Sequence, residues 1–326
     1  MNVKDQRQTA LKMDGDTQPS TWENSLVAQL VSVWGCFPVV IRAVLSGLIL
    51  SAVGTIPCAI LVSANSKHWS AVPWAVPPAA LYLWAFWRFA RGSGWPQSST
   101  EARRALCRAN SLSGDVWGMA LIAGVMGLAA VMLFQGVMAR LITLPQQQGG
   151  EASHFPFVTL LFWVLMGSVV AGVVEETAFR GYMQGPIERR HGPVIAILVT
   201  GGLFGFAHFT HPEVGLILLP YYLAVAAVYG ALAYLTNSIF PSMVLHAGGN
   251  ILGALALFGQ GRSEWQASSR QTPLIWESGA DASFWIAVVV FLIVGGAAVG
   301  AYAALARVAQ KARQDVSVRD RPRCEV

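Results

Sequence analysis

The sequence predicts an all-α protein embedded in a membrane through about eight transmembrane helices. Of its 326 residues, 54% are hydrophobic and only 12% are charged, about half the charged fraction of an ordinary soluble domain. The apolar residues gather in stretches of about 20, the length at which an α-helix crosses the hydrocarbon core. Twelve tryptophans and 15 phenylalanines exclude a disordered chain, and four scattered cysteines exclude a disulfide scaffold or a zinc ribbon.

Eight apolar stretches follow one another along the chain and predict the helices in order. The second is the weakest, because Pro73, Pro77 and Pro78 interrupt it and Arg88 ends it, although membrane helices tolerate proline better than soluble ones. The fourth contains an uninterrupted apolar run from Phe157 to Val174. The eight stretches are 37–63, 71–90, 115–143, 157–176, 194–210, 214–236, 238–259 and 283–307.

Polar segments flank this membrane region. We expect a polar cytoplasmic tail at 1–36, a helical membrane domain at 37–307 and a basic cytoplasmic tail at 308–326. The first 24 residues hold no apolar run, so no cleavable signal peptide is expected. With the N-terminus inside, eight spans place 18 of the 22 Lys and Arg residues in the cytoplasm, as the positive-inside rule requires. In a bacterium the membrane would be the plasma (inner) membrane.

The basic residues of the second cytoplasmic loop receive no functional role. Arg103, Arg104 and Arg108 lie between the second and third apolar stretches. We expect them to be solvated residues that fix the orientation of the chain.

Acidic residues at the end of an apolar run are the first candidates for function, because an ionisable group at hydrocarbon depth costs roughly 2.5–3.5 kcal/mol on insertion scales. Glu175 and Glu176 end the run that starts at Phe157, and Arg180 follows them. On a helix Glu176 and Arg180 are one turn apart and able to pair. Glu175 would then point about 100° away, free for another role.

Two histidines complete the set of polar residues at depth. His208 ends the run Leu203-Phe-Gly-Phe-Ala-His in the fifth stretch. His246 begins the segment His-Ala-Gly-Gly-Asn, so that Asn250 shares its helix face. Glycine and alanine flank all of these positions and would allow the helices to approach closely in lipid. Two histidines, an amide and a glutamate on three different spans favour a shared site over isolated packing residues.

Two kinds of chemistry fit this set, and the residues alone leave both open. A carboxylate beside a histidine activates water, while a second histidine and an amide stabilise an oxyanion, as in an amide hydrolase. Alternatively, Glu175, His208 and His246 could hold a divalent metal such as zinc, with water as the fourth ligand. No H-E-x-x-H motif, intramembrane aspartate, phosphate-binding loop or nucleic-acid groove is recognisable.

Three short motifs carry a resemblance to a known family. Glu175-Glu176-Thr-Ala-Phe-Arg180 matches E-E-x-x-x-R, Phe204-Gly-Phe-Ala-His208 matches F-x-x-x-H, and His246-Ala-Gly-Gly-Asn250 matches H-x-x-x-N. In this order, within 157–259, they resemble the CPBP family of CAAX-protease and bacteriocin-processing (Abi) intramembrane proteases, which is related to the Rce1-type prenyl-protein proteases.

The resemblance implies an eight-helix endopeptidase that hydrolyses a membrane-associated protein or peptide, prenylated or of the bacteriocin or leader type, with its site between helices four, five and seven. It implies that Glu175 is the catalytic base, assisted by His208. His246 and Asn250 would stabilise the oxyanion or bind metal, and Arg180 would orient Glu175 and Glu176. No other cofactor is implied.

Two alternatives and one geometric condition accompany this hypothesis. The buried Glu and His residues would also suit a transporter or binding protein for protons, a metal or a small solute, and the glycine-rich helices would suit a non-catalytic scaffold. For a shared site, Glu175 and His208 must lie within about 8 Å of each other. We therefore expect the fourth helix to run to about Met183, and the fifth to begin after Val194 with Pro193 in an interfacial loop.

Overall fold

The computed structural model describes residues 29, 32–143, 155–208, 212–258 and 273–319. It divides into two units, residues 1–42 and residues 43–326, and each is described by itself. In the first unit the ring of Trp34 packs edge-on against Phe37, with 6.4 Å between the ring centroids. All of the candidate site residues belong to the second unit.

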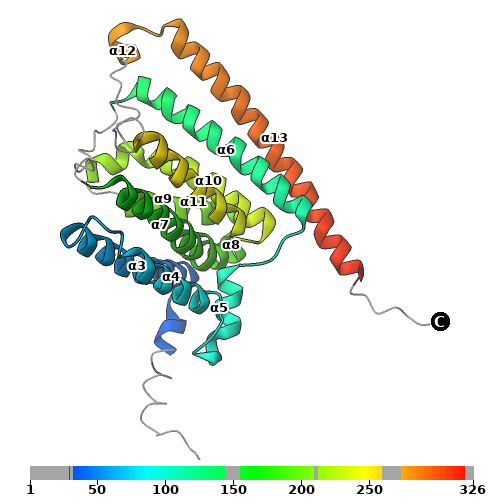
Figure 1. Ribbon diagram of the computed structural model, residues 1–326. Helices are drawn as coiled ribbons and strands as arrows, with labels where there is room; N and C mark the ends of the chain where they lie inside the picture. Colours follow the sequence, from blue (N-terminus) through cyan, green and yellow to red (C-terminus); the bar gives the residue numbers. More distant parts are fainter. Residues whose placement is uncertain (1–28, 30–31, 144–154, 209–211, 259–272, 320–326) are drawn as a thin grey trace, which may run out of the picture. The chain divides into compact units, whose positions relative to one another are not determined.

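Every regular element in the described ranges is a helix, which confirms the all-α fold (Figure 1). Each of the eight predicted stretches overlaps a helix in the described residues, although the second stretch starts five residues before its helix. The elements are α3 Val39–Lys67, α4 Val76–Ala90, η1 Gln97–Ser99, α5 Thr100–Cys107, α6 Gly114–Leu141, α7 Phe157–Glu175, η3 Glu176–Met183, α8 Gln184–His191, α9 Pro193–Ala207, α10 Pro212–Thr236, α11 Phe240–Phe258, α12 Ile275–Ser278 and α13 Ala282–Arg319.

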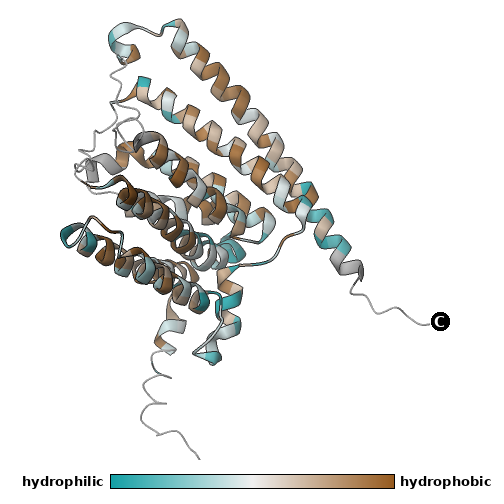
Figure 2. Cartoon of the chain, viewed as in Figure 1, coloured by the Kyte–Doolittle hydropathy of each residue, from teal (hydrophilic) through white to brown (hydrophobic). Residues whose placement is uncertain are grey.

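Five helical segments are long and apolar enough to cross a membrane, so the chain is an integral, multi-pass membrane protein. They are Val39–Lys67, Gly114–Leu141, Phe157–His191, Leu216–Thr236 and Ala282–Asp315. Figure 2 shows apolar residues along most of α13 and polar residues toward its C-terminal end. Large apolar side chains such as Ile293 and Leu252 are exposed, as expected of surfaces that face lipid. Residues 308–319 of the predicted basic tail continue α13.

Two of the predicted spans form shorter helices. Helices α4 and α9 have 15 residues each, which corresponds to about 22 Å along the helix axis. Helix α4 begins at Val76 because Pro77 and Pro78 occupy its first turn, where the missing N–H groups are not needed. The first turn thus tolerates the prolines that weakened this prediction.

The fourth predicted span is one continuous helical segment from Phe157 to His191, made of α7, η3 and α8. This confirms that it continues past Glu176, and it extends beyond the expected end near Met183. The prediction that Pro193 lies in a loop and that the next helix starts after Val194 was wrong, because α9 starts at Pro193 itself. The fixed φ of proline suits a first helical turn, and Gly192, at φ +83°, reverses the chain just before it.

The reversal of the chain at Gly192 explains how Glu175 and His208 come to lie at the same height along their two helices. Glu175 lies seventeen residues before Gly192, and His208 lies sixteen residues after it. Helices α8 and α9 pack against each other as the two arms of a hairpin. Residues at nearly equal distances from its turn therefore lie side by side.

Close helix packing surrounds these residues. Helix α7 packs against α11, α9 against α10, and α6 against α13, as Figure 1 shows. A Cβ atom on Gly172 would lie 2.9 Å from the carbonyl oxygen of Met243, and one on Gly201 would lie 2.7 Å from the Cβ of Ala226. These two glycines therefore allow α7 to approach α11 and α9 to approach α10.

Candidate active site

The two glutamates lie where the α-helix changes to a π-helix. Glu175 is the last residue of α7, and η3, from Glu176 to Met183, is π-helical and buried throughout. The hydroxyl of Thr177 donates a hydrogen bond to the carbonyl of Val173 at 2.6 Å, so it occupies an acceptor of the preceding turn. Single π-helical turns inside α-helices are rare and occur frequently at functional sites.

Four of the predicted residues meet at this point. Glu175 Oε2 lies 3.9 Å from His208 Nε2 and 3.8 Å from His246 Nε2. Glu176 Oε1 lies 2.9 Å from the other nitrogen of His246, Nδ1. The condition that Glu175 and His208 share a site is therefore met, and both glutamates face the same imidazole.

Hydrogen bonding assigns the tautomer of both histidines. His246 Nδ1 faces the Glu176 carboxylate, and His208 Nδ1 lies 2.7 Å from the carbonyl oxygen of Phe204. Both partners accept hydrogen bonds, so we place a hydrogen on Nδ1 of each neutral imidazole. The Nε2 lone pairs of both rings then point toward Glu175.

Glu175 Oε2 therefore shares its surroundings with two further hydrogen-bond acceptors. It is buried and receives no hydrogen bond from any residue in the described part of the chain. Separations of 3.8 and 3.9 Å are too long for direct hydrogen bonds. A single water molecule about 2.8 Å from the carboxylate and from an imidazole nitrogen would fit such a separation and would donate to both.

Arg180 holds Glu176 from the other side. Its side chain is 1% exposed, and its Nη1 lies 3.4 Å from Glu176 Oε1. The guanidinium group also lies over the rings of Phe204 and Tyr229, 4.7 and 5.5 Å from their centroids. The predicted pairing of Arg180 with Glu176 is present, and the two aromatic faces add a cation–π attraction.

Asn250 lies one helical turn after His246 on α11 and is half-buried. Among the described residues, no polar contact joins it to the glutamates or to the histidines. Its predicted role in stabilising an oxyanion stays a prediction.

The site does not fit the predicted metal. Ligand atoms around a tetrahedral zinc ion with bonds of 2.0–2.1 Å lie about 3.3–3.4 Å apart. The Nε2 atoms of His208 and His246 are 3.9 and 3.8 Å from Glu175 Oε2. In the described ranges, no three His, Cys, Asp or Glu side chains form a group that could hold a metal ion. We therefore derive no catalytic step through a metal.

The prediction that Arg103 and Arg108 lie in a solvated loop was wrong. Both are buried, and Arg103 donates hydrogen bonds to the carbonyl oxygens of Phe89, Gly94 and Pro96. Arg108 follows α5 with a left-handed φ of +56°. Burial lowers the pKa of the Arg108 guanidinium from its ordinary value, and the carboxylate of Glu188 opposes that shift.

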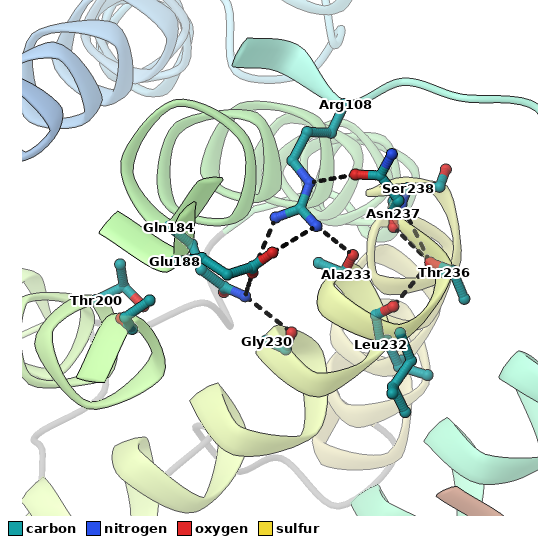
Figure 3. Close-up of polar contacts among 12 residues, drawn as sticks. Arg108, Gln184, Glu188, Thr200, Gly230, Leu232, Ala233, Thr236, Asn237 and Ser238 are labelled. Atoms are coloured by element: carbon teal, nitrogen blue, oxygen red, sulfur yellow. Dashed lines mark hydrogen bonds and ion pairs between the residues drawn. The ribbon is translucent and has the colours of Figure 1, made fainter. Parts of the chain in front are cut away.

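Figure 3 shows how Arg108 and Gln184 join three helices near the site. Arg108 donates to both carboxylate oxygens of Glu188, at 3.2 and 3.3 Å, and to the carbonyl of Ala233 at 2.7 Å. Gln184 donates to the carbonyl of Gly230 at 2.9 Å. These hydrogen bonds join helices α8 and α10 to the C-terminal end of α5, directly after η3. Glu176, Arg180, Gln184 and Glu188 recur every fourth residue, and the first three are fully buried.

Comparison with known proteins adds an independent finding. Residues 157–252 match the family model described as type II CAAX prenyl endopeptidase Rce1-like. Comparisons with the curated proteins and with the solved structures find no match. The matched region starts with α7 and contains every candidate residue from Glu175 to Asn250. Residues 157–252 thus form a domain of the Rce1-like CAAX prenyl endopeptidase family, which is a family of proteases.

Proposed function

We propose that this protein is an intramembrane endopeptidase in which Glu175 and His208 activate a water molecule for attack on a peptide bond. One observation carries the proposal: both histidine Nε2 atoms lie within 3.9 Å of the same buried oxygen of Glu175. Because each Nδ1 is bonded to an acceptor, both Nε2 atoms are ready to take up a proton. This arrangement provides bases for a water molecule.

The proposed reaction is a simple hydrolysis. Glu175, assisted by His208, removes a proton from water while the water oxygen bonds to the carbonyl carbon of the peptide. The carbonyl oxygen becomes an oxyanion, which the amide of Asn250 stabilises by hydrogen bonding together with His246, whose Nε2 has by then taken up a proton from solvent. The proton held by Glu175 or His208 then passes to the amide nitrogen as the C–N bond breaks. The products are a carboxylate and an amine.

Glu176 and Arg180 support this chemistry without touching the substrate. Glu176 accepts a hydrogen bond from His246 Nδ1 and so orients that ring with Nε2 toward Glu175. Arg180 lies on the far side of Glu176 and balances its charge. Charges that are paired in this way are much less costly in a low-dielectric region than isolated ones.

The proposed substrate is a membrane-associated protein or peptide. The side chains of Glu175 and His208 are 18% and 34% exposed, so a peptide is able to reach them. The name of the matched family suggests a prenylated C-a-a-X terminus as the first substrate to test. We further propose eight transmembrane helices with both termini on the cytoplasmic side, as the distribution of Lys and Arg favours. The family resemblance implies that the site opens toward the same side.

The test compares peptide termini in membranes from cells that lack this protein and are complemented with wild type, Glu175→Gln or Glu277→Gln. Glu277 is an exposed glutamate of α12 and serves as the matched control. Termini that appear with wild type and with Glu277→Gln, but not with an equally abundant Glu175→Gln variant, would support the proposal. No difference in termini would refute it. A phenotype that survives in Glu175→Gln would then favour a scaffold, and one that is lost would favour a transporter.

A further inference from the structure

Two tyrosines of α10 lie against the two histidines of the site. Tyr229 stacks on His246, with ring centroids 5.2 Å apart and planes 15° from parallel. Tyr222 lies against His208, with a centroid distance of 5.0 Å and an angle of 30°. Seven residues, about two helical turns, separate the two tyrosines, so they share one face of α10. Both are buried.

Each imidazole is therefore held at one edge and on one face. His246 is held at Nδ1 by Glu176 and on its face by Tyr229. His208 is held at Nδ1 by the carbonyl of Phe204 and on its face by Tyr222. The hydrogen bond at Nδ1 leaves the ring free to tilt about that bond, and contact with a flat aromatic ring opposes the tilt.

The position of these tyrosines is itself fixed by α10. Between them, Ala226 packs closely on Gly201 of α9. Directly after Tyr229, the carbonyl of Gly230 accepts the hydrogen bond from Gln184, as Figure 3 shows. Just before it, the hydroxyl of Tyr302 donates to the carbonyl of Val228 at 2.9 Å. Helix α10 is thus tied to its neighbours on both sides of Tyr229.

We infer that Tyr222 and Tyr229 are positioning residues that set the ring planes of His208 and His246 and so aim both Nε2 atoms at the Glu175 carboxylate. The inference rests on the proposed function for its effect on catalysis. The contact uses the ring of each tyrosine and does not require its hydroxyl group. Because misplacement of a catalytic group by about 1 Å can reduce a rate about 100-fold, loss of the ring should be visible in kcat.

The kinetic test uses full-length protein and a quenched fluorescent peptide with a farnesylated C-a-a-X terminus. Tyr222→Met and Tyr229→Met should each lower kcat about 10-fold to about 100-fold with little change in KM. Tyr222→Phe and Tyr229→Phe should keep kcat within about 2-fold of wild type. Tyr234→Met, which alters an exposed tyrosine of the same helix, is the control and should keep kcat.

A second measurement is independent of activity. In protein with ¹³C-labelled histidine, ring currents of the stacked tyrosines should shift the imidazole signals of His208 and His246 away from the values of free histidine. Tyr229→Met should move the His246 signal alone, Tyr222→Met should move the His208 signal alone, and Tyr234→Met should move neither. If the Met variants do not fold, the inference is still tested by the shifts of the imidazole signals in the wild type and by the activity of the Phe variants.

Several results would overturn the inference. Phe variants as inactive as the Met variants would place the requirement on the hydroxyl group. Unshifted imidazole signals in the wild type would show that the rings do not stack. If the wild type cleaves no peptide and produces no new termini in cells, the proposed function fails and the catalytic role of the tyrosines fails with it. The two failures are distinguishable, because the signals report the stacking without any cleavage.

Discussion

Replacement of Gly172 by alanine should disturb the site from a distance. The new Cβ would lie 2.9 Å from the carbonyl oxygen of Met243, 2.9 Å from the Cβ of Ala247 and 3.1 Å from its backbone nitrogen. Carbon atoms in contact are ordinarily about 3.5–4.0 Å apart. Because two of the three atoms belong to the backbone, α7 and α11 would have to separate by about 0.5–1 Å.

This separation has a cost in stability and in activity. Overpacking typically costs about 1–3 kcal/mol, of which the higher helix propensity of alanine recovers about 1 kcal/mol. The free energy of unfolding should therefore fall by up to about 2 kcal/mol. Glu175 and His246 are close in sequence to the two contact points, so their separation of 3.8 Å should grow. We expect kcat to fall about 10-fold or more.

Gly167, on the same helix, supplies the matched control, because a Cβ atom there meets no other described atom within 4 Å. Gly167→Ala should keep activity and should stabilise the protein by up to about 1 kcal/mol. Unfolding in mixed detergent micelles measures the stability, and cleavage of the farnesylated peptide measures kcat. Equal stability and equal activity of the two variants would refute the argument that Gly172 is required for close helix packing.

Three further predictions concern charges and metals. Glu188→Ala should lower the free energy of unfolding by about 3–5 kcal/mol, because the buried Arg108 guanidinium would lose its carboxylate partner. A double-mutant cycle with Arg108→Ala that gives a coupling energy below about 0.5 kcal/mol would contradict this. Hydrogen bonds from the Phe284 amide and the Ser283 hydroxyl, with the nearby Arg140, hold the pKa of Asp281 below its usual range. The ionised Asp281 carboxylate therefore stabilises the fold above the ordinary pKa of about 3.9, and this stabilisation is lost as the pH falls through the lower pKa of the folded state. The difference in Tm between wild type and Asp281→Asn should therefore shrink between pH 7 and pH 3, and a constant difference would contradict the prediction. Treatment with EDTA or 1,10-phenanthroline should leave kcat unchanged, whereas a loss that zinc restores would argue for a metal held by Glu175, His208 and His246.

Long apolar runs made the helices predictable, and their ends were harder to place. The segment that starts at Phe157 continues to His191 although its second half is polar. Residues such as Gln184 are covered by other helices and not by lipid, so a hydropathy pattern does not reveal that they are helical. The loop at Pro193 is predicted only to bring His208 to the level of Glu175, whereas the chain reverses at Gly192 and Pro193 already begins the next helix.

The polar members of the site were predictable because ionisable groups are rare and costly at membrane depth. That cost singled out Glu175, His208 and His246 without any three-dimensional information. Tyr229 was missed because an aromatic residue in an apolar helix is ordinary. Arg108 was missed because a basic residue in a cytoplasmic loop already agrees with the positive-inside rule. Only the structure shows that it is buried and paired.

The buried polar residues between Glu176 and Glu188 also bear on how the protein is made. The ribosome synthesises the segment from Phe157 to His191 before α9, α10 and α11, which cover those residues. Until these three helices are in place, each charged side chain near the middle of the bilayer raises the free energy of insertion by about 2.5–3.5 kcal/mol. The apolar first half of the segment is able to enter lipid by itself, whereas its charged second half is stabilised only when the later helices cover it. A nascent chain that stops after His191 would leave that second half uncovered.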